Sequence, residues 1–402
     1  MLASTFPAGP DDGTPAFVRD LAEYEAAEFE TLVLVPRVPG SARRERLGRL
    51  TVQRFRYFPG RWEDLAAGAI LENLRRRRSR CLQVLPFVLA EAWALHQAVR
   101  RHRPDVLHLH WLLPQGLAAL LAGRGVPWLV TTLGDDVYAL SDPVSRGLKR
   151  AALRRAAAVT AMNADMADRL VALGAPRSRV HVLPMGADVG TVRAGAARVD
   201  RVPGRILFVG RLVEKKGAAV LLDALRRVEA PGWSLTVVGD GPLRADLEQA
   251  AAGLPVTFRG ALPRRELAAE YGRSEIDTVP SVAAASGDQD GLPVSLLEAM
   301  AAGCAVVGSR IPGIDAAVLD GDSGVQVPPG DPAALAAALT GLLADPDRRA
   351  ELGAAASARA DDFSVDAAGH RDGALLRAVA GRVGCPAPPA RPAGALDAGG
   401  AR

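Results

Sequence analysis

Two carboxylates and a glycine turn surround one expected helix start in the last third of the chain. Gly291 and Leu292 follow Asp290, and seven residues separate Asp290 from Glu298. Pro293 suits the first turn of a helix, where its missing N–H would have had no partner. The N–H groups of Gly291 and Leu292 would then lie at a positive helix end that attracts phosphate, with carboxylates nearby to accept bonds from sugar hydroxyls. As a bare pattern, the stretch favours a capped helix with one exposed acid.

A second stretch supplies positive charge at another expected strand end. Gly210 and Arg211 follow the apolar run 205–209, and Lys216 comes just before the expected helix 218–228. An arginine and a lysine beside a helix amino end suit a diphosphate. A solvated basic turn explains the same residues equally well.

Two further candidates stand at other strand ends. Gly239 and Gly241 form a strand-to-helix turn, which is common in any doubly wound sheet. His110 ends the expected strand 106–110, where its imidazole would face a ligand cleft; a packed strand-end histidine is the alternative.

The elements that must position these residues alternate between strand and helix along the whole chain. This alternation predicts an α/β protein whose parallel, doubly wound sheets bind ligands beyond the carboxyl ends of their strands. Two such domains facing each other leave a cleft, the usual place for a ligand. Strands are expected at 31–35, 106–110, 128–132, 158–162 and 180–183, then at 205–209, 234–238, 256–258, 276–279, 305–308 and 324–327, with helices at 84–101, 148–158 and 332–343 among others.

The same pattern divides the chain into parts. Residues 189–203 lack periodicity and are expected to link the two domains, and a last helix could cross back to the first domain. The expected parts are a first domain at 1–188, a second domain at 204–364, the last helix at 365–384 and a disordered Pro-, Ala- and Gly-rich tail at 385–402.

The composition is that of a folded chain without a compartment signal. With 402 residues, 49% hydrophobic and 23% charged, the chain is neither fibrous nor wholly disordered. The best apolar run, 81–95, is shorter than the roughly 20 residues that a bilayer requires. Residues 1–10 lack a basic leader, and Cys81, Cys304 and Cys385 form no close pair, so we expect a cytoplasmic protein with no disulfide and no zinc site.

One cluster of arginines stands out against the mild net charge of +4. It could attract anionic lipid or an anionic acceptor, and a solvated arginine face is the alternative. No aromatic residues interleave it, so we expect no nucleic-acid partner. The cluster comprises Arg75, Arg76, Arg77, Arg78 and Arg80, with Arg100, Arg101 and Arg103 a helix length later.

Taken together, these motifs resemble the family 4 retaining glycosyltransferases, which have the GT-B fold of two Rossmann-like domains facing across a cleft. The family's two acids match Asp290 and Glu298, its Gly-Arg-Leu and Lys-Gly match residues 210–217, and its Gly-x-Gly-Pro turn matches 239–242. Looser matches at 4–18, 104–116, 131–138 and 182–188 extend the resemblance over residues 2–363.

The resemblance implies roles for single residues. Glu298 would hold the ribose, Asp290 the donor sugar, and Arg211 and Lys216 the leaving diphosphate, while the segment around Arg259 would hold the base. The implied catalytic residues are His110, Arg211, Lys216 and Asp290. The implied donor-binding residues are Gly13, Gly210, Arg211, Lys216, Gly239, Gly241, Arg259, Asp290, Gly291, Leu292, Val294 and Glu298.

This sequence departs from the family at two positions. Asp290 stands where a glutamate is usual, and Leu133 stands where many relatives have a histidine. Asp288 and Asp290 have the Asp-x-Asp spacing of metal-dependent transferases of another fold. We expect neither a metal nor any other cofactor, because Arg211 and Lys216 supply the positive charge and the resemblance implies no metal.

The function that the resemblance implies is retaining transfer of a hexose from a nucleotide-diphosphate sugar to a hydroxyl, in cell-surface glycan, glycolipid or secondary-metabolite glycoside synthesis. A sugar-nucleotide epimerase or hydrolase of the same fold, and a donor-binding subunit with impaired catalysis, are the alternatives. The arginine cluster suggests a lipid-linked or anionic acceptor, with peripheral contact at the inner face of the plasma membrane.

Overall fold

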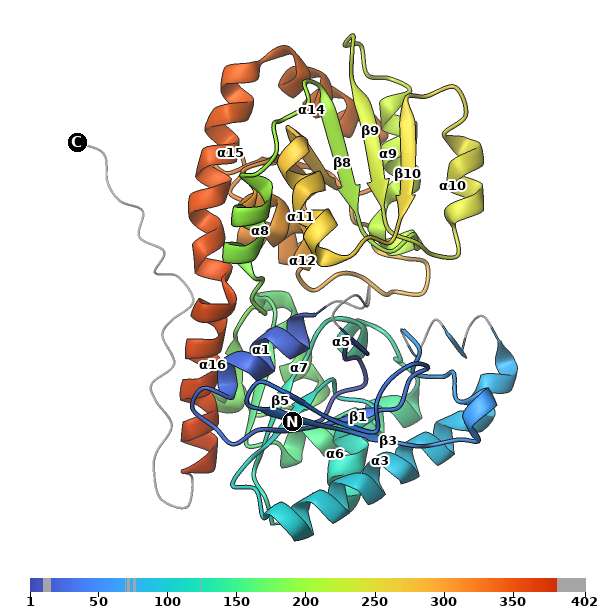
Figure 1. The fold of residues 1–402 in the computed structure, drawn as a ribbon, viewed down its shortest axis with the longest axis vertical. Coiled ribbons are helices and arrows are strands. Elements are labelled where there is room, and N and C mark those ends of the chain that lie inside the picture. Colours follow the sequence, from blue (N-terminus) through green and yellow to red (C-terminus); the bar gives the residue numbers. More distant parts are fainter. Residues whose placement is uncertain (10–15, 69, 71–72, 75–76, 124, 382–402) are drawn as a thin grey trace, which may run out of the picture.

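The computed structural model describes residues 1–9, 16–68, 70, 73–74, 77–123 and 125–381 (Figure 1). Two α/β domains are stacked on each other, the first below and the second above. The second domain holds six parallel strands in the order β10-β9-β8-β11-β12-β13. They are β8 (Arg205–Val209), β9 (Ser234–Val238), β10 (Val256–Gly260), β11 (Ile276–Val279), β12 (Ala305–Ser309) and β13 (Val325–Val327).

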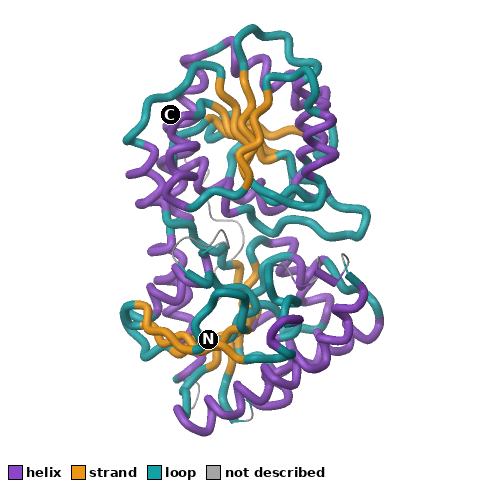
Figure 2. Tube along the Cα trace, turned by 45° about the vertical axis from the view of Figure 1, so that its right-hand side comes forward, coloured by secondary structure: helices purple, strands orange, loops and turns teal. Residues whose placement is uncertain are grey.

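Helices cover both faces of this sheet, which is why the central strands β11 and β12 are wholly buried (Figure 2). One apolar core lies under α12 and α15, and a second lies under α9 and α14. The helices are α9 (Ala218–Leu225), α10 (Arg244–Ala250), α11 (Arg264–Arg273), α12 (Val294–Ala301), α13 (Pro312–Ala317), α14 (Pro332–Ala344) and α15 (Pro346–Ala360).

The first domain has one extended sheet, because Leu2 bridges β1 and β4. On one side of Leu2 lie β1 and a hairpin, in which β2 runs antiparallel to β3; on the other lie four parallel strands. The hairpin was not expected. The strands are β1 (Leu32–Pro36), β2 (Arg44–Leu47), β3 (Leu50–Phe55), β4 (Leu107–His110), β5 (Trp128–Thr131), β6 (Ala158–Ala161) and β7 (Val180–Val182).

The helices of the first domain pack on this sheet and on each other. The longest, α3, packs against α4 along the outer side of the domain. They are α1 (Phe17–Glu25), α3 (Cys81–His102), α4 (Gln115–Ala122), α5 (Asp135–Tyr138), α6 (Pro143–Arg155) and α7 (Ala164–Leu173).

The segment expected as a linker, 189–203, contains a helix, α8 (Val189–Ala196), that the sequence analysis missed. It packs on α11 and α12, and a Cβ at Gly195 would lie 2.6 Å from the Cβ of Ala268. The helix therefore forms through tertiary packing and belongs structurally with the second domain.

The last helix, α16 (Val365–Ala380), leaves the second domain and packs on α1 and β5 of the first (Figure 1). Leu375, Leu376 and Val379 share a small core with Leu129 and Ala158. The chain thus crosses between the domains twice. The expected tail, 385–402, lies outside the described residues.

Candidate functional site

The loops after β8 and β9 lie in close contact, at the edge of the second sheet that faces the first domain. A Cβ at Gly239, whose φ is +136°, would lie 1.9 Å from the carbonyl oxygen of Gly210. A Cβ at Gly241 would lie 2.4 Å from the carbonyl oxygen of Leu212. Glycine is needed at both positions because the two backbones are in direct contact and a side chain would clash.

The charged centre of the site is a cluster of Asp290 and its partners. Lys216 Nζ donates to Asp290 Oδ2 over 2.8 Å, Ser281 Oγ donates to the same oxygen over 2.8 Å, and Lys215 Nζ lies 3.9 Å from Oδ1. Burial acts to raise the pKa of Asp290, but the two ammonium groups hold it below its ordinary value. Asp290 is therefore an anion, although only 7% of it is exposed.

Lys215 joins the two domains across the cleft. Its Nζ donates to Asp135 at the start of α5 and, over 3.2 Å, to Asp288 of the second domain. Burial and the neighbouring Asp135 carboxylate raise the pKa of Asp288 to about 6. We call Lys215, Asp135 and Asp288 the cross-cleft cluster.

A second inter-domain contact fixes the loop before α12. Asn163 Nδ2, just after β6, donates to the carbonyl oxygen of Gly291 over 2.7 Å. A Cβ at Gly291 would lie 3.2 Å from the carbonyl oxygen of Leu133, so only glycine fits comfortably between the domains. Leu292 packs against the cores of both domains. The backbone expected to receive the donor therefore lies at the domain contact.

The start of α12 differs slightly from expectation. Pro293 is the residue before the helix, with φ −67° and ψ 124°, and not part of its first turn. Val294 is the first helical residue and is half-buried. The helix still begins shortly after Asp290 and contains Glu298, as the sequence predicts.

Glu298 lies one helical turn further along α12. Tyr271 donates its hydroxyl hydrogen to Glu298 Oε2 over 3.0 Å, and removal from water raises the pKa of Glu298 to about 7. Nearby, Arg264 pairs with Asp20 of α1 over 2.9 Å and with Asp188 over 3.3 Å. Glu298 thus lies beside a third contact between the domains.

Two expected site residues, Arg259 and His110, lie apart from this centre. Arg259 is exposed on β10 and pairs with Glu270 over 3.2 Å. His110 is fully buried beside His108, neither of its ring nitrogens has a hydrogen-bond partner, and burial holds its pKa well below the ordinary value, so its imidazole is neutral. Arg211, by contrast, is exposed just after β8 and interacts electrostatically with the Asp288 carboxylate of this centre. Gly13 lies outside the described residues.

The sequence analysis missed Lys215, Asp135 and Asn163 as site residues. Asp135 and Asn163 each come shortly after a strand, β5 and β6, at the sheet edge that faces the second domain. Polar residues at these strand ends were the available signal. What could not be predicted is their partner, because it lies in the other domain.

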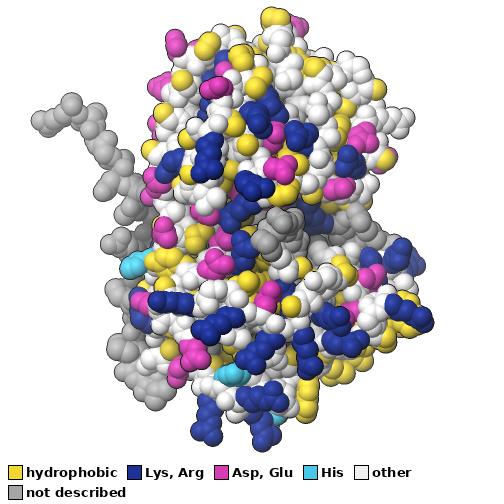
Figure 3. Space-filling view, viewed as in Figure 1, with side chains coloured by type: hydrophobic (Ala, Val, Ile, Leu, Met, Phe, Trp, Pro, Cys, Tyr) yellow, Lys and Arg dark blue, Asp and Glu magenta, His cyan; other side chains and the backbone are white. Residues whose placement is uncertain are grey.

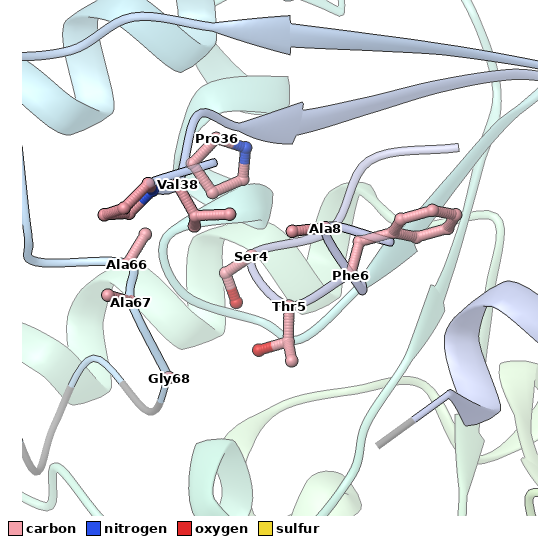
Figure 4. Close-up of a pocket in the computed structure, with 10 residues that line it drawn as sticks. Ser4, Thr5, Phe6, Ala8, Pro36, Val38, Ala66, Ala67 and Gly68 are labelled. Carbon is pink, nitrogen blue, oxygen red and sulfur yellow. The ribbon is translucent and has the colours of Figure 1, made fainter. Parts of the chain in front are cut away.

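A pocket of about 290 Å³ lies in the first domain, between the segment Ser4–Ala8 and the end of β1 (Figure 4). The hydroxyls of Ser4 and Thr5 are its only side-chain polar groups among the residues that line it. Opposite them lie Ala66, Ala67 and Gly68. The lining suits a ligand with an apolar body and hydroxyl groups.

One buried acid and histidine cluster lies away from the cleft. Glu25, His108 and Asp372 place their oxygen and nitrogen atoms within 4.8 Å of one another. His108 Nδ1 already pairs with Glu25 over 2.9 Å, and Nε2 pairs with Thr131 Oγ1 over 2.8 Å. The cluster joins α1, β4 and α16, so it contributes to packing of the last helix on the first domain.

Comparisons with known proteins agree on one enzyme class. Residues 203–345 match the family model described as "Glycosyl transferases group 1", and residues 12–186 match "Glycosyl transferase 4-like domain". The chain is 37% identical over 180 residues to the amylovoran biosynthesis glycosyltransferase AmsK of Erwinia amylovora, but this covers only 43% of the chain and 44% of the relative. It is 32% identical over 342 residues to the 2-deoxystreptamine glucosyltransferase of Streptomyces kanamyceticus, covering 75% of the chain and 86% of the relative.

Solved structures share the fold. The sucrose-phosphate synthase of Thermosynechococcus elongatus superposes with a TM-score of 0.75 at 22% identity, covering 94% of this chain and 98% of that one. Anabaena HepE in complex with UDP-glucose superposes with a TM-score of 0.69 at 17% identity, with the same coverage. The expected arrangement of two Rossmann-like domains is thereby confirmed.

Proposed function

The chain belongs to the group 1 glycosyltransferases with the GT-B fold, and we propose that it is a retaining enzyme that transfers a hexose from a nucleotide-diphosphate sugar to a hydroxyl acceptor. The observation that carries this proposal is the cluster of Lys216, Asp290 and Ser281 at the strand ends that face the first domain. It places a cation, which suits the diphosphate, beside a carboxylate, which suits the sugar hydroxyls.

Lys216 and Arg211 bind the diphosphate and stabilise the charge that develops as it leaves. The carboxylate of Asp290 accepts hydrogen bonds from sugar hydroxyls, and Glu298 accepts them from the ribose. We propose that no metal or other cofactor is needed, because Lys215 and Lys216 already neutralise the two carboxylates of the Asp-x-Asp pattern. Activity unchanged by a chelator would agree with this.

We propose that the retaining reaction does not use Asp290 as a nucleophile. Its carboxylate is held by Lys216 and Ser281, so it is poorly available as a nucleophile. The leaving phosphate then takes the proton of the acceptor hydroxyl on the face from which it departs, and the new bond forms on that face.

We place the acceptor in the first domain, in the pocket beside Ser4 and Thr5. The two hydroxyls suit a hydroxylated acceptor, and the apolar lining suits a lipid-linked or aglycone body better than an anion in direct contact. We propose that the reaction takes place in the cytoplasm. The unpaired cysteines Cys81 and Cys304 support a reducing compartment.

The donor is tested by calorimetric titration of the whole chain with UDP, GDP and ADP and with their hexose conjugates, repeated on Glu298→Ala and Arg211→Ala. HepE was crystallised with UDP-glucose and another relative is named as GDP-mannose-dependent, so both bases are included. The proposal predicts one preferred nucleotide, bound at least about tenfold more weakly by both variants. Binding of none of them would contradict a donor site.

The reaction is tested by proton NMR of the turnover mixture with the preferred donor. A retaining transferase releases the sugar with the α configuration when water replaces the acceptor and the donor is an α-glycoside. Net conversion of the nucleotide sugar into its epimer would identify an epimerase, and release of free sugar and diphosphate that no hydroxyl acceptor reduces would identify a hydrolase. Tight donor binding without turnover, alone or with hydroxyl acceptors, would identify a donor-binding subunit.

A further inference from the structure

One helix of the first domain presents an apolar stripe to solvent. Leu82, Leu85, Leu89 and Trp93 of α3 are 73%, 67%, 56% and 64% exposed. They are three or four positions apart, so they lie on one face of the helix. With Val84, they make up five of the twelve exposed large apolar side chains in the part of the chain that the structure describes. We call these four residues the α3 stripe.

Positive charge continues the α3 stripe at both ends. Arg78 stands four positions before Leu82, and Arg100 stands seven after Trp93; both are exposed and fall on the same face. Arg77, Arg101 and Arg103 are exposed beside them. In Figure 3, yellow side chains gather along the lower right edge of the molecule, over α3, with dark blue side chains next to them.

No negative charge opposes these arginines on the helix itself. The only acidic residue of α3 is Glu91, which is fully buried and accepts a hydrogen bond from Gln115 Nε2 over 3.1 Å. An apolar face with cationic ends and no acid suits the interface between the headgroups and the hydrocarbon of an anionic membrane.

A second aromatic side chain lies beside the first turn of α3. Trp62 is 52% exposed, and the guanidinium of Arg61 lies 4.1 Å from the centre of its ring. This segment is tied to the helix through Asp64, which accepts hydrogen bonds from Arg80 over 2.7 Å and from Gln83 over 2.9 Å. Tryptophan with arginine is the pair that anchors proteins at membrane interfaces.

The helix lies along a surface and does not span a bilayer. Residues Arg78–His102 are long and apolar enough to cross one by length and composition alone. However, Phe87, Val88, Ala92 and Leu95 of α3 are buried inside the first domain, where the helix packs on α4. If the helix crossed a membrane, these side chains would have to leave the core of the first domain. If the helix lies parallel to the membrane surface, the α3 stripe is buried in lipid and the core stays intact.

We propose that the α3 stripe, with its flanking arginines and Trp62, docks the enzyme on the surface of a membrane that contains anionic lipids. The apolar side chains enter the boundary of the hydrocarbon, while the guanidinium groups bind lipid phosphates. Docking involves neither the donor site nor turnover, so it holds or fails independently of the proposed function. It also brings the first domain, which holds the proposed acceptor pocket, to the lipid surface.

The test is sedimentation of the full chain with vesicles of phosphatidylcholine, with and without phosphatidylglycerol. We expect binding to the anionic vesicles that weakens as salt is raised, and little binding to the neutral ones. Leu85→Gln/Leu89→Gln/Trp93→Gln should bind at least about tenfold more weakly. Arg78→Ser/Arg100→Ser should weaken binding to the anionic vesicles by a similar factor and should remove most of its salt dependence. The control Val144→Gln/Leu319→Gln, at two exposed apolar positions elsewhere, should sediment as the wild type does.

Each variant is first checked for its circular dichroism spectrum and its nucleotide affinity, so that a loss of binding is not a loss of fold. Wild-type protein that remains in the supernatant with anionic vesicles overturns the proposal, and so does a triple variant that sediments like the wild type. A wild type that forms dimers without lipid, while the triple variant stays monomeric, would assign the stripe to self-association and also overturn it.

Discussion

The two domains have the same layered architecture but are specialised at different places. In the second domain, the distinctive features lie at the strand ends, where glycine loops touch and Lys216 meets Asp290. In the first domain, they lie in the apolar pocket and on the outer helix α3. Under the proposed function, donor chemistry depends on the second domain, whereas the first domain holds the proposed acceptor pocket and the proposed membrane-docking helix.

The largest expected effect comes from removing the cation beside Asp290. Lys216→Met approximately keeps the length of the side chain but removes the ammonium group that is proposed to bind the departing diphosphate. We expect diphosphate release from the preferred nucleotide sugar to fall about a hundredfold to a thousandfold. Arg227→Met, at an exposed position after α9, is the control. Turnover within a few-fold of wild type would remove Lys216 from the catalytic residues.

A smaller effect with a pH signature is expected at Glu298. Its pKa of about 7 in the free protein should fall when ribose hydroxyls donate to it, because such bonds favour the ionised form. Donor binding then releases a proton, so affinity for the preferred nucleotide sugar rises with pH through about 7 and levels off above it, over a range of roughly tenfold. Glu298→Gln should bind weakly at every pH. The same slope in the glutamine variant would assign the titration to another group.

The cross-cleft cluster should have an intermediate role that depends on both domains. Lys215→Met leaves the carboxylates of Asp135 and Asp288 without the cation between them, whereas Asp135→Asn removes one of the two negative charges. We therefore expect turnover to fall about tenfold in the first variant and less in the second. Small-angle scattering of both proteins would report whether the cleft opens. Equal losses in the two variants would argue against this electrostatic account.

The smallest effect on donor chemistry should come from the outer face of the first domain. Leu85→Gln/Leu89→Gln/Trp93→Gln changes only exposed side chains on α3, far from the strand ends of the second domain. Its affinity for the preferred nucleotide should stay within about twofold of wild type by calorimetry. A large loss of nucleotide affinity would contradict the proposal that α3 takes no part in donor binding.

The sequence predicted the regular parts of the fold well, because buried parallel strands are continuous apolar runs. Residues 205–209 and 234–238 are strands with the expected bounds. The hairpin strand Arg44–Leu47 escaped prediction because its first three residues are all charged, so it lacks an apolar face. Helix Val189–Ala196 escaped because its glycines and alanines carry little periodicity and are ordered by packing on α11 and α12.

Within the candidate site, the sequence predicted Asp290 just before a helix, Lys216 between a strand and a helix, and Glu298 inside a helix, and the structure has them in these positions. Tight turns and strand ends leave local signals, so these positions were accessible. Lys215 with Asp135, and Asn163 with Gly291, join residues of different domains. Their pairing depends on the relative orientation of the domains, which no local pattern encodes.

The central claim, that the donor binds at the strand ends of the second domain, is tested most directly by hydrogen–deuterium exchange of the full chain. Exchange is compared with and without the nucleoside diphosphate that binds most tightly in the calorimetric screen. We predict that protection is concentrated in residues 210–217, 239–241 and 281–298, with weaker protection around Asp135 and Asn163 as the cleft closes. Protection confined to the first domain, with these loops unchanged, would contradict the account.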